Sequence, residues 1–220
     1  MPVPGTKDGV SRYICSMKNA AKIRLSRVEQ QLVKRSDWIL TKNSVMQKIR
    51  VMLEALQNER QGIVPEAIPP YLQVPLLISP KISRGENYRG LPWLVLDQPR
   101  YFNREEMLAI RTMFWWGEHF SVTLLVSGGL KKQMKPSLLS AFSMLRKNNY
   151  AICIAADPWE HHFEADNFVS LGSLTPKAYR EYVSRHTFFK AGIRIPIADT
   201  GTLHEKLNSE YRRLMRIVMG

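Results

Sequence analysis

Four short, almost uninterrupted apolar runs constrain the fold of this chain more than any other feature. They cover residues 91–96, 120–126, 150–155 and 192–197, and segments with helical patterns lie between them. Strands that alternate with helices of about ten residues favour βαβ units, and strands that are apolar throughout are typical of sheets with helices on both faces. The sequence therefore predicts an α/β fold with a mixed sheet covered by helices. The alternative is an α+β fold with an antiparallel sheet.

The aromatic segment between the first two runs has the pattern of a helix. Asn103 and Glu106 have capping-box spacing, and Gly117 is placed to end a helix. We expect Arg111, Trp115 and Trp116 on this helix and His119 just beyond it. The aromatic side chains then pack in the core or form one wall of a ligand pocket, with Arg111 among its polar members.

The first 92 residues divide into two parts. Residues 1–62 carry two amphipathic helical patterns, which predict either a helical hairpin or one long bent helix. Residues 63–92 contain six prolines, which exclude a long helix or a central strand and indicate an extended connector. We expect a basic helical arm (1–62), a connector (63–92) and an α/β body (93–220), with the arm packed on the body as one compact domain.

Positive charge is concentrated in the arm. The chain has 32 Lys and Arg against 19 Asp and Glu, and residues 1–62 hold 12 of the basic and 5 of the acidic groups. Such a surface suits a polyanion or an acidic protein partner. Deletion of residues 1–62 is expected to abolish such binding without unfolding the rest. The basic residues that we assign to this surface are Lys18, Lys22, Arg24, Arg27, Lys34 and Arg35.

Several classes of protein are excluded by composition and pattern. With 45% hydrophobic residues the chain is too apolar for a disordered basic tail, and no window approaches about 18 apolar residues, so no transmembrane segment is predicted. The start lacks the layout of a secretory signal. The only cysteines, Cys15 and Cys153, have no Cys-x-x-Cys partner. These features favour a cytoplasmic protein with reduced thiols.

A polar and aromatic cluster at residues 159–166 is the first candidate site. If this segment is extended, Glu160, His162 and Glu164 point to one side and His161 to the other. One imidazole and two carboxylates can hold a divalent metal or perform acid–base chemistry. His162, Glu164, Asp157 and His119 are the candidate catalytic residues, and His161 is a candidate ligand contact. The alternative is a polar edge strand packed on the body.

A glycine and lysine segment after the second apolar run is another candidate. Gly128 and Gly129 permit close approach of the backbone, while Lys131 and Lys132 add positive charge before a helix that we expect from Pro136. Phosphate binding is one interpretation and a solvated turn is the other. If strands 120–126 and 150–155 are parallel, their carboxyl ends share one sheet edge, which would gather this segment with Asp157 and His161.

No sequence motif implies a cofactor or a reaction. The glycine-rich nucleotide loops, the serine-hydrolase elbow and the zinc-protease helix motif are all missing. Three hypotheses follow, and whether the protein is an enzyme stays open. It binds a ligand or partner through its basic helical surface, which we favour because no catalytic set is complete. Alternatively, it is an enzyme or small-ligand protein with a pocket near His161, His162 and Glu164. The third hypothesis is a purely structural module.

Overall fold

The computed structural model describes residues 23–61, 67–197 and 201–220, and the chain separates into two compact units, residues 1–45 and 46–220. In the first unit, α2 (Arg27–Lys34) begins at a reciprocal capping box between Ser26 and Glu29, and α3 (Asp37–Gln61) begins after a two-residue break. The sequence pattern placed the start of the second helix near Asn43, which lies inside α3. Lys18 and Lys22 lie outside the described residues.

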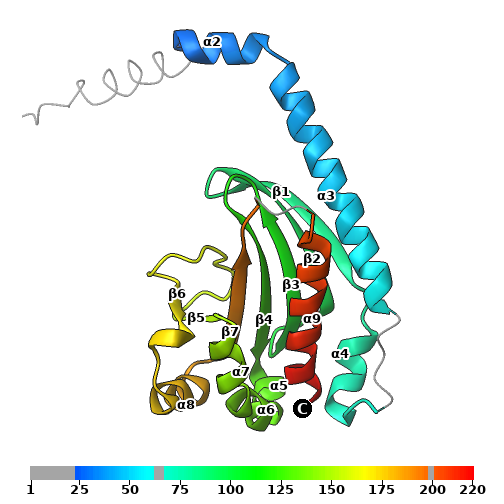
Figure 1. Cartoon of the computed structure of the whole chain (residues 1–220), viewed down its shortest axis with the longest axis vertical. Helices are drawn as coiled ribbons and strands as arrows, with labels where there is room; N and C mark the ends of the chain where they lie inside the picture. The colour runs from blue at the N-terminus through cyan, green and yellow to red at the C-terminus, as the bar shows by residue number, and fades with distance from the viewer. Residues whose placement is uncertain (1–22, 62–66, 198–200) are drawn as a thin grey trace, which may run out of the picture. The chain divides into compact units, whose positions relative to one another are not determined.

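The second unit contains a seven-stranded sheet (Figure 1) in which every strand pairing is antiparallel. This confirms the α/β class, and the sheet has the antiparallel arrangement that we had kept as the alternative. β4 and β5 both pair with β7 between them, so these two strands point in the same direction. The spatial order is β1 (Lys81–Tyr88), β2 (Leu91–Phe102), β3 (Met107–Trp115), β4 (His119–Ser127), β7 (Phe188–Ile195), β5 (Ala151–Cys153) and β6 (Phe168–Ser170).

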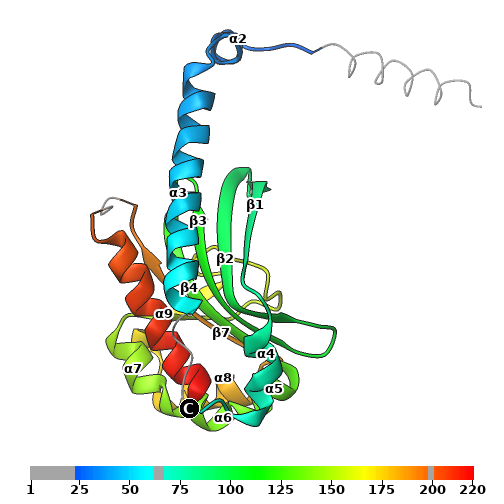
Figure 2. The ribbon, with the colours of Figure 1, turned by 90° about the vertical axis from the view of Figure 1, so that its right-hand side faces the viewer.

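Helices cover one face of this sheet. The terminal helix α9 (Leu203–Met219) runs along it in both views (Figures 1 and 2) and contacts β3 and β4, while α4 (Gln73–Leu77) contacts β2. We call this the helix-covered face. The remaining helical elements are η1 (Pro70–Leu72), α5 (Gly128–Gln133), α6 (Lys135–Ser140), α7 (Phe142–Lys147), η2 (Leu171–Ser173) and α8 (Pro176–Arg185).

The main hydrophobic core lies on the helix-covered face because alternate strand residues point there. Ile110 on β3 and Leu124 on β4 are fully buried in one cluster with Leu214 of α9. Leu53 and Leu56 of α3 are fully buried in the same cluster. Deletion of residues 1–62 would therefore remove two side chains of the core, so we now expect it to destabilise the rest of the chain as well.

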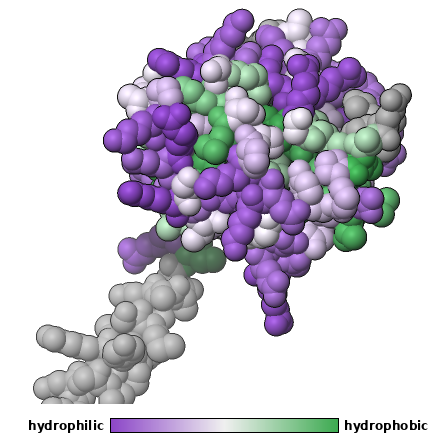
Figure 3. All heavy atoms as spheres, turned by 90° about the horizontal axis from the view of Figure 1, so that it is seen from below, coloured by the Kyte–Doolittle hydropathy of each residue, from purple (hydrophilic) through white to green (hydrophobic). Residues whose placement is uncertain are grey.

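Most side chains on the face shown in Figure 3 are hydrophilic, and the apolar ones form small separate areas between them. Within the described residues, no helix combines the length and apolar character that crossing a bilayer requires.

The helix expected over residues 103–116 is not formed, because this segment makes a hairpin turn and the strand β3. The Oδ1 atom of Asn103 accepts hydrogen bonds from the backbone N–H groups of Glu105 and Glu106, as in a capped helix, but the backbone then enters the sheet. Residues 107–115 alternate between the two faces of the sheet, and the segment pairs with β2 on one side and β4 on the other. A local capping pattern was outweighed by strand pairing on both sides.

The segment at Gly128 is a helix rather than a loop before a later helix. α5 begins at Gly128, whose φ of +64° favours glycine, and a Cβ there would lie 2.3 Å from the carbonyl oxygen of Glu105. The Glu106 carboxylate accepts a hydrogen bond from the backbone N–H of Leu130 at 3.1 Å. Because Gly128 has no side chain, the β2–β3 turn can approach its backbone closely. The carboxylate of Glu106 occupies the start of α5, where the sequence suggested that a phosphate could bind.

Candidate functional site

The sheet face opposite α9 is covered by the loop 154–167 and carries a row of polar groups. Asp97, Arg111, Thr123 and Gly192 lie at one level on four neighbouring strands. The Nε and Nη2 atoms of Arg111 each donate to one carboxylate oxygen of Asp97 at 2.8 Å, a bidentate pair that is largely buried. We call this the loop-covered face, and the pair forms its centre.

His161 of the covering loop completes this centre. Its Nε2 lies 2.8 Å from Nη1 of Arg111, and because a guanidinium only donates, Nε2 must be the acceptor. The neutral ring then carries its proton on Nδ1, which faces Nζ of Lys190 at 3.4 Å. Burial lowers the pKa of His161 well below its ordinary value, and the charges of Lys190 and Arg111 lower it further. The imidazole is therefore neutral at neutral pH.

Lys190 anchors the loop from beneath and was missed by the sequence analysis. It is 1% exposed, and its Nζ donates to the carbonyl oxygens of Pro158, at 2.9 Å, and Glu160. Burial lowers its pKa to about 8. The Nζ atom donates to the carbonyls in either charge state, but only its neutral form, which predominates above about pH 8, can accept the Nδ1 proton of His161. Its position between Phe189 and Ala191, inside an apolar stretch, was the one feature of the sequence that could have predicted a buried lysine.

A cavity opens above the Asp97–Arg111 pair. Its volume is about 340 Å³, within the range of small-ligand sites. The Arg111 guanidinium lies 5.5 Å from the ring centre of Trp159, which is close enough for a cation–π contact. Aromatic side chains form its walls, and charged or ring-nitrogen groups form its floor. Tyr88, Trp93 and Trp159 belong to the walls, and Asp97, Arg111 and His161 belong to the floor.

Tyr88, from the strand β1, ties the loop to the sheet. Its hydroxyl oxygen accepts hydrogen bonds from the backbone N–H groups of His161, at 2.6 Å, and His162, at 3.2 Å. The same oxygen lies 3.0 Å from Oε2 of Glu160 and 3.0 Å from Nδ1 of His162. Burial raises the pKa of Tyr88, so the phenol stays protonated. β1 lies inside the segment that we had interpreted as a connector, which is why Tyr88 was overlooked.

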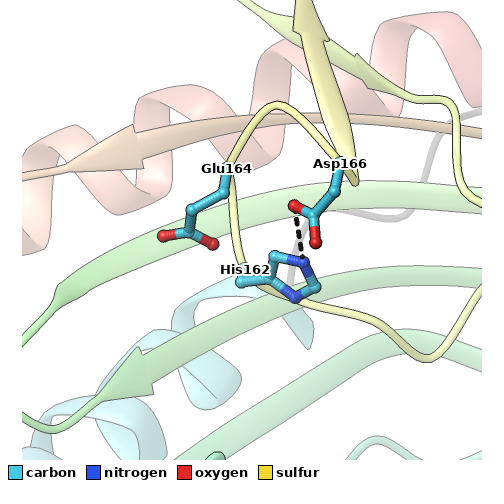
Figure 4. Close-up of side chains that lie close together, drawn as sticks. All are labelled: His162, Glu164 and Asp166. Atoms are coloured by element: carbon cyan, nitrogen blue, oxygen red, sulfur yellow. Dashed lines mark hydrogen bonds and ion pairs between the residues drawn. The ribbon is translucent and has the colours of Figure 1, made fainter.

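The polar side of the loop gathers His162, Glu164 and Asp166 (Figure 4). One ligand atom from each residue lies within 4.8 Å of the others, and Nε2 of His162 is 3.2 Å from Asp166. Glu160, which the sequence grouped with His162, lies beside the opposite ring nitrogen. Arg89 is 3.6 Å from Glu164 and 3.7 Å from Asp166, so a guanidinium already partly neutralises these carboxylates.

The other residues singled out in the sequence have contacts elsewhere. Asp157 is exposed and accepts a hydrogen bond from the Trp159 backbone at 2.8 Å, which makes it part of a turn. Gly128 and Gly129 contact the β2–β3 turn. Lys131 donates to the carbonyl oxygen of His186, and Lys132 is exposed. These contacts give the glycine and lysine segment a structural role at the end of β4.

The aromatic residues at the end of β3 separate onto the two faces. Trp115 lies under Tyr88 on the loop-covered face and donates to its carbonyl oxygen at 3.2 Å, whereas Trp116 packs against Phe114 of the main core. His119 stacks edge-on against Trp115 and Phe163 and lines a second cavity of about 690 Å³. Burial lowers the pKa of His119 to about 4, so it is neutral at neutral pH.

No protein-family model, no curated protein and no solved structure matches the chain.

Proposed function

We propose that the protein binds a small ligand in the cavity of the loop-covered face. The observation that carries the proposal is the Asp97–Arg111–His161 floor beneath the aromatic walls. Buried ionic groups are costly unless they are paired, and an open cavity above them gives a ligand access to oriented donors. This proposal takes up the hypothesis of a pocket near His161, His162 and Glu164 and places it on the His161 side of the loop.

The lining indicates the chemistry of the ligand. Tyr88, Trp93 and Trp159 offer flat apolar surface, which suits a planar or aromatic body. Asp97 balances Arg111, and Lys190 behind the ring of His161 adds positive charge when it is protonated. We therefore expect a compact aromatic ligand that carries one anionic or strongly accepting group.

A cavity-filling substitution tests this proposal. Ser83 lines the cavity on β1, and the neighbouring Arg84 is exposed, so Ser83→Trp fills the site while Arg84→Trp serves as the matched control. The probe is naphthalene sulfonate, with neutral naphthyl methanol for comparison, and binding is followed by ligand-observed NMR. We expect Ser83→Trp to weaken sulfonate binding at least about tenfold and the control to leave it unchanged. Equal binding by the two variants would overturn the proposal.

A second candidate function is binding of a polyanion or acidic partner through the basic residues of the arm. Arg24, Arg27 and Lys34 are exposed and form no ion pair with other described residues, whereas Arg35 pairs with Asp37 at 2.6 Å. Free cationic side chains on one short segment support this candidate. The assignment of Lys18 and Lys22 to the same surface stays a prediction.

Heparin provides the test of the second candidate. The full chain should elute from immobilised heparin at a salt concentration that falls when Arg24 and Arg27 are both changed to Ser. Arg84→Ser, an exposed arginine in the sheet, is the control and should leave elution unchanged. Equal elution of the two variants would contradict the candidate.

We also propose the cytoplasm as the compartment. Cys153 is a buried free thiol, and burial raises its pKa, which keeps it unreactive. A redox stain of the thiols in intact cells, read by mass spectrometry, should find Cys153 reduced.

A further inference from the structure

The arm exposes an unusual amount of apolar surface. Residues 23–40 contain eight of the fourteen exposed large apolar side chains among the described residues. Ile23 is 87% exposed, Val33 is 74% exposed and Leu40 is 63% exposed. Eight exposed apolar side chains within 18 residues make this segment a candidate interaction surface, because scattered single exposures are the norm elsewhere. The full set is Ile23, Leu25, Val28, Leu32, Val33, Trp38, Ile39 and Leu40.

The charge of the same segment restricts what can cover it. Residues 23–45 contain five basic and two acidic residues, and the chain as a whole carries a formal charge of +13. A second copy of this chain would bring positive charge against positive charge. A nucleic acid would satisfy the basic groups but leave the apolar side chains in water. The occupant must be anionic and must also accept apolar side chains.

A bilayer that contains anionic lipids meets both requirements with one surface. Its head groups attract Lys and Arg, and its acyl boundary takes up apolar side chains of helices that lie in the interface. Trp38, whose Nε1 donates to the carbonyl oxygen of Leu32 at 3.3 Å, lies next to the break between α2 and α3 and is 47% exposed. Tryptophan is enriched at the interface between lipid and water.

We propose that residues 23–45 of the arm dock on the surface of an anionic membrane, with their apolar side chains in the acyl boundary and their basic side chains at the head groups. This inference rests on the second candidate function and names the class of its anionic partner. It requires no helix that crosses the bilayer.

Vesicle flotation with the full chain tests this inference. The vesicles contain phosphatidylcholine alone or phosphatidylcholine with phosphatidylglycerol. We expect flotation only with the mixed vesicles. Val33→Ser with Leu40→Ser removes apolar surface without a change of charge and should weaken vesicle binding at least about tenfold while heparin elution stays the same. The matched control is Val74→Ser with Leu77→Ser, two exposed apolar residues outside the arm, which should leave both readouts unchanged.

Each outcome decides between the proposals. Heparin binding without flotation overturns the membrane inference and leaves the polyanion candidate intact. Failure of both readouts overturns both. Loss of heparin binding together with flotation in the Val33→Ser and Leu40→Ser variant, at unchanged charge, would show a general defect and would overturn the assignment of the apolar side chains to lipid. A dimer that dissociates in this variant, measured by light scattering, would assign the surface to a second copy instead.

Discussion

The two faces of the sheet are covered by different kinds of structure, and their chemistry differs accordingly. On the helix-covered face, α9 and the end of α3 bury apolar residues such as Ile110 and Leu124. On the loop-covered face, an irregular segment lies over Arg111 and Lys190. Helices satisfy their own backbone groups and therefore pack on apolar surface, while a loop brings unpaired carbonyl groups that require buried donors. On the loop-covered face Lys190 is such a donor, because its Nζ donates to the carbonyl groups of Pro158 and Glu160.

The largest expected effect comes from breaking the central ion pair. Arg111→Met should lower the free energy of unfolding by about 3–5 kcal/mol, because Asp97 would stay buried without a partner. The double variant Asp97→Leu with Arg111→Met should recover most of this loss. Leu124→Ala on the helix-covered face, at about 2–5 kcal/mol, is the reference. Urea unfolding measures all three, and a double variant as unstable as the single one would contradict the account.

The next effect concerns pH. The pKa of Lys190 is lowered in the folded state to about 8, so the unfolded chain binds more protons above that value, and the contribution of this residue to stability should rise with pH. The gain develops between about pH 8 and the ordinary lysine pKa and is on the order of 3 kcal/mol. In Lys190→Met this rise should disappear. Thermal unfolding across the alkaline range measures it, and parallel curves for the two proteins would argue against it.

A smaller effect is expected at the contact between the loop and the sheet. A Cβ at Gly192 would lie 2.4 Å from Cγ2 of Thr123 and 3.1 Å from the ring of Phe163. Gly192→Ala should therefore cost about 1–3 kcal/mol. Thr123→Ser removes the nearer methyl group, so the double variant should be more stable than Gly192→Ala. If the double variant is less stable than Gly192→Ala, the added methyl group clashes with Phe163 rather than with Thr123.

The smallest effect concerns metal binding on the exposed side of the loop. Arg89 competes with any divalent cation at His162, Glu164 and Asp166. Arg89→Ala should raise the affinity for Zn²⁺ about fivefold, because an exposed ion pair contributes up to about 1 kcal/mol and the carboxylates would be released from it. Arg84→Ala is the control, and calorimetric titration at neutral pH is the measurement. An unchanged affinity in Arg89→Ala would show that these three residues do not bind the ion.

The sequence predicted the fold class and the positions of several strands because apolar runs report burial directly. Residues 120–126 lie within β4, and β5 (Ala151–Cys153) is the central part of the run 150–155. It was wrong for residues 103–116, where Asn103 makes the same backbone contacts in a hairpin turn that it would make at a helix start. Local patterns specify hydrogen bonds near one residue, and only the neighbouring strands decide which structure continues.

The candidate site was predicted in part for a related reason. His161 and Arg111 were singled out for their chemistry, and the fold joins them although 50 positions separate them in the chain. Tyr88 and Lys190 were missed because their importance comes from long-range contacts. The prolines around Tyr88 concealed an edge strand, and the apolar neighbours of Lys190 resembled an ordinary strand.

The Tyr88 hydroxyl has a consequence that follows from counting hydrogens. Its oxygen already accepts two backbone N–H groups, and its single proton has two acceptors within reach, Glu160 and Nδ1 of His162. If the proton goes to Nδ1, the neutral imidazole carries its own proton on Nε2 and donates it to Asp166. If it goes to Glu160, Nδ1 no longer has to accept the phenol proton and can itself donate to Glu160, so Nε2 is no longer fixed as a donor to Asp166. The tautomer of His162 thus links the hydrogen bond of the Tyr88 hydroxyl to that of the exposed Asp166 carboxylate. Neutron diffraction or the nitrogen chemical shifts of His162 would show which tautomer is present.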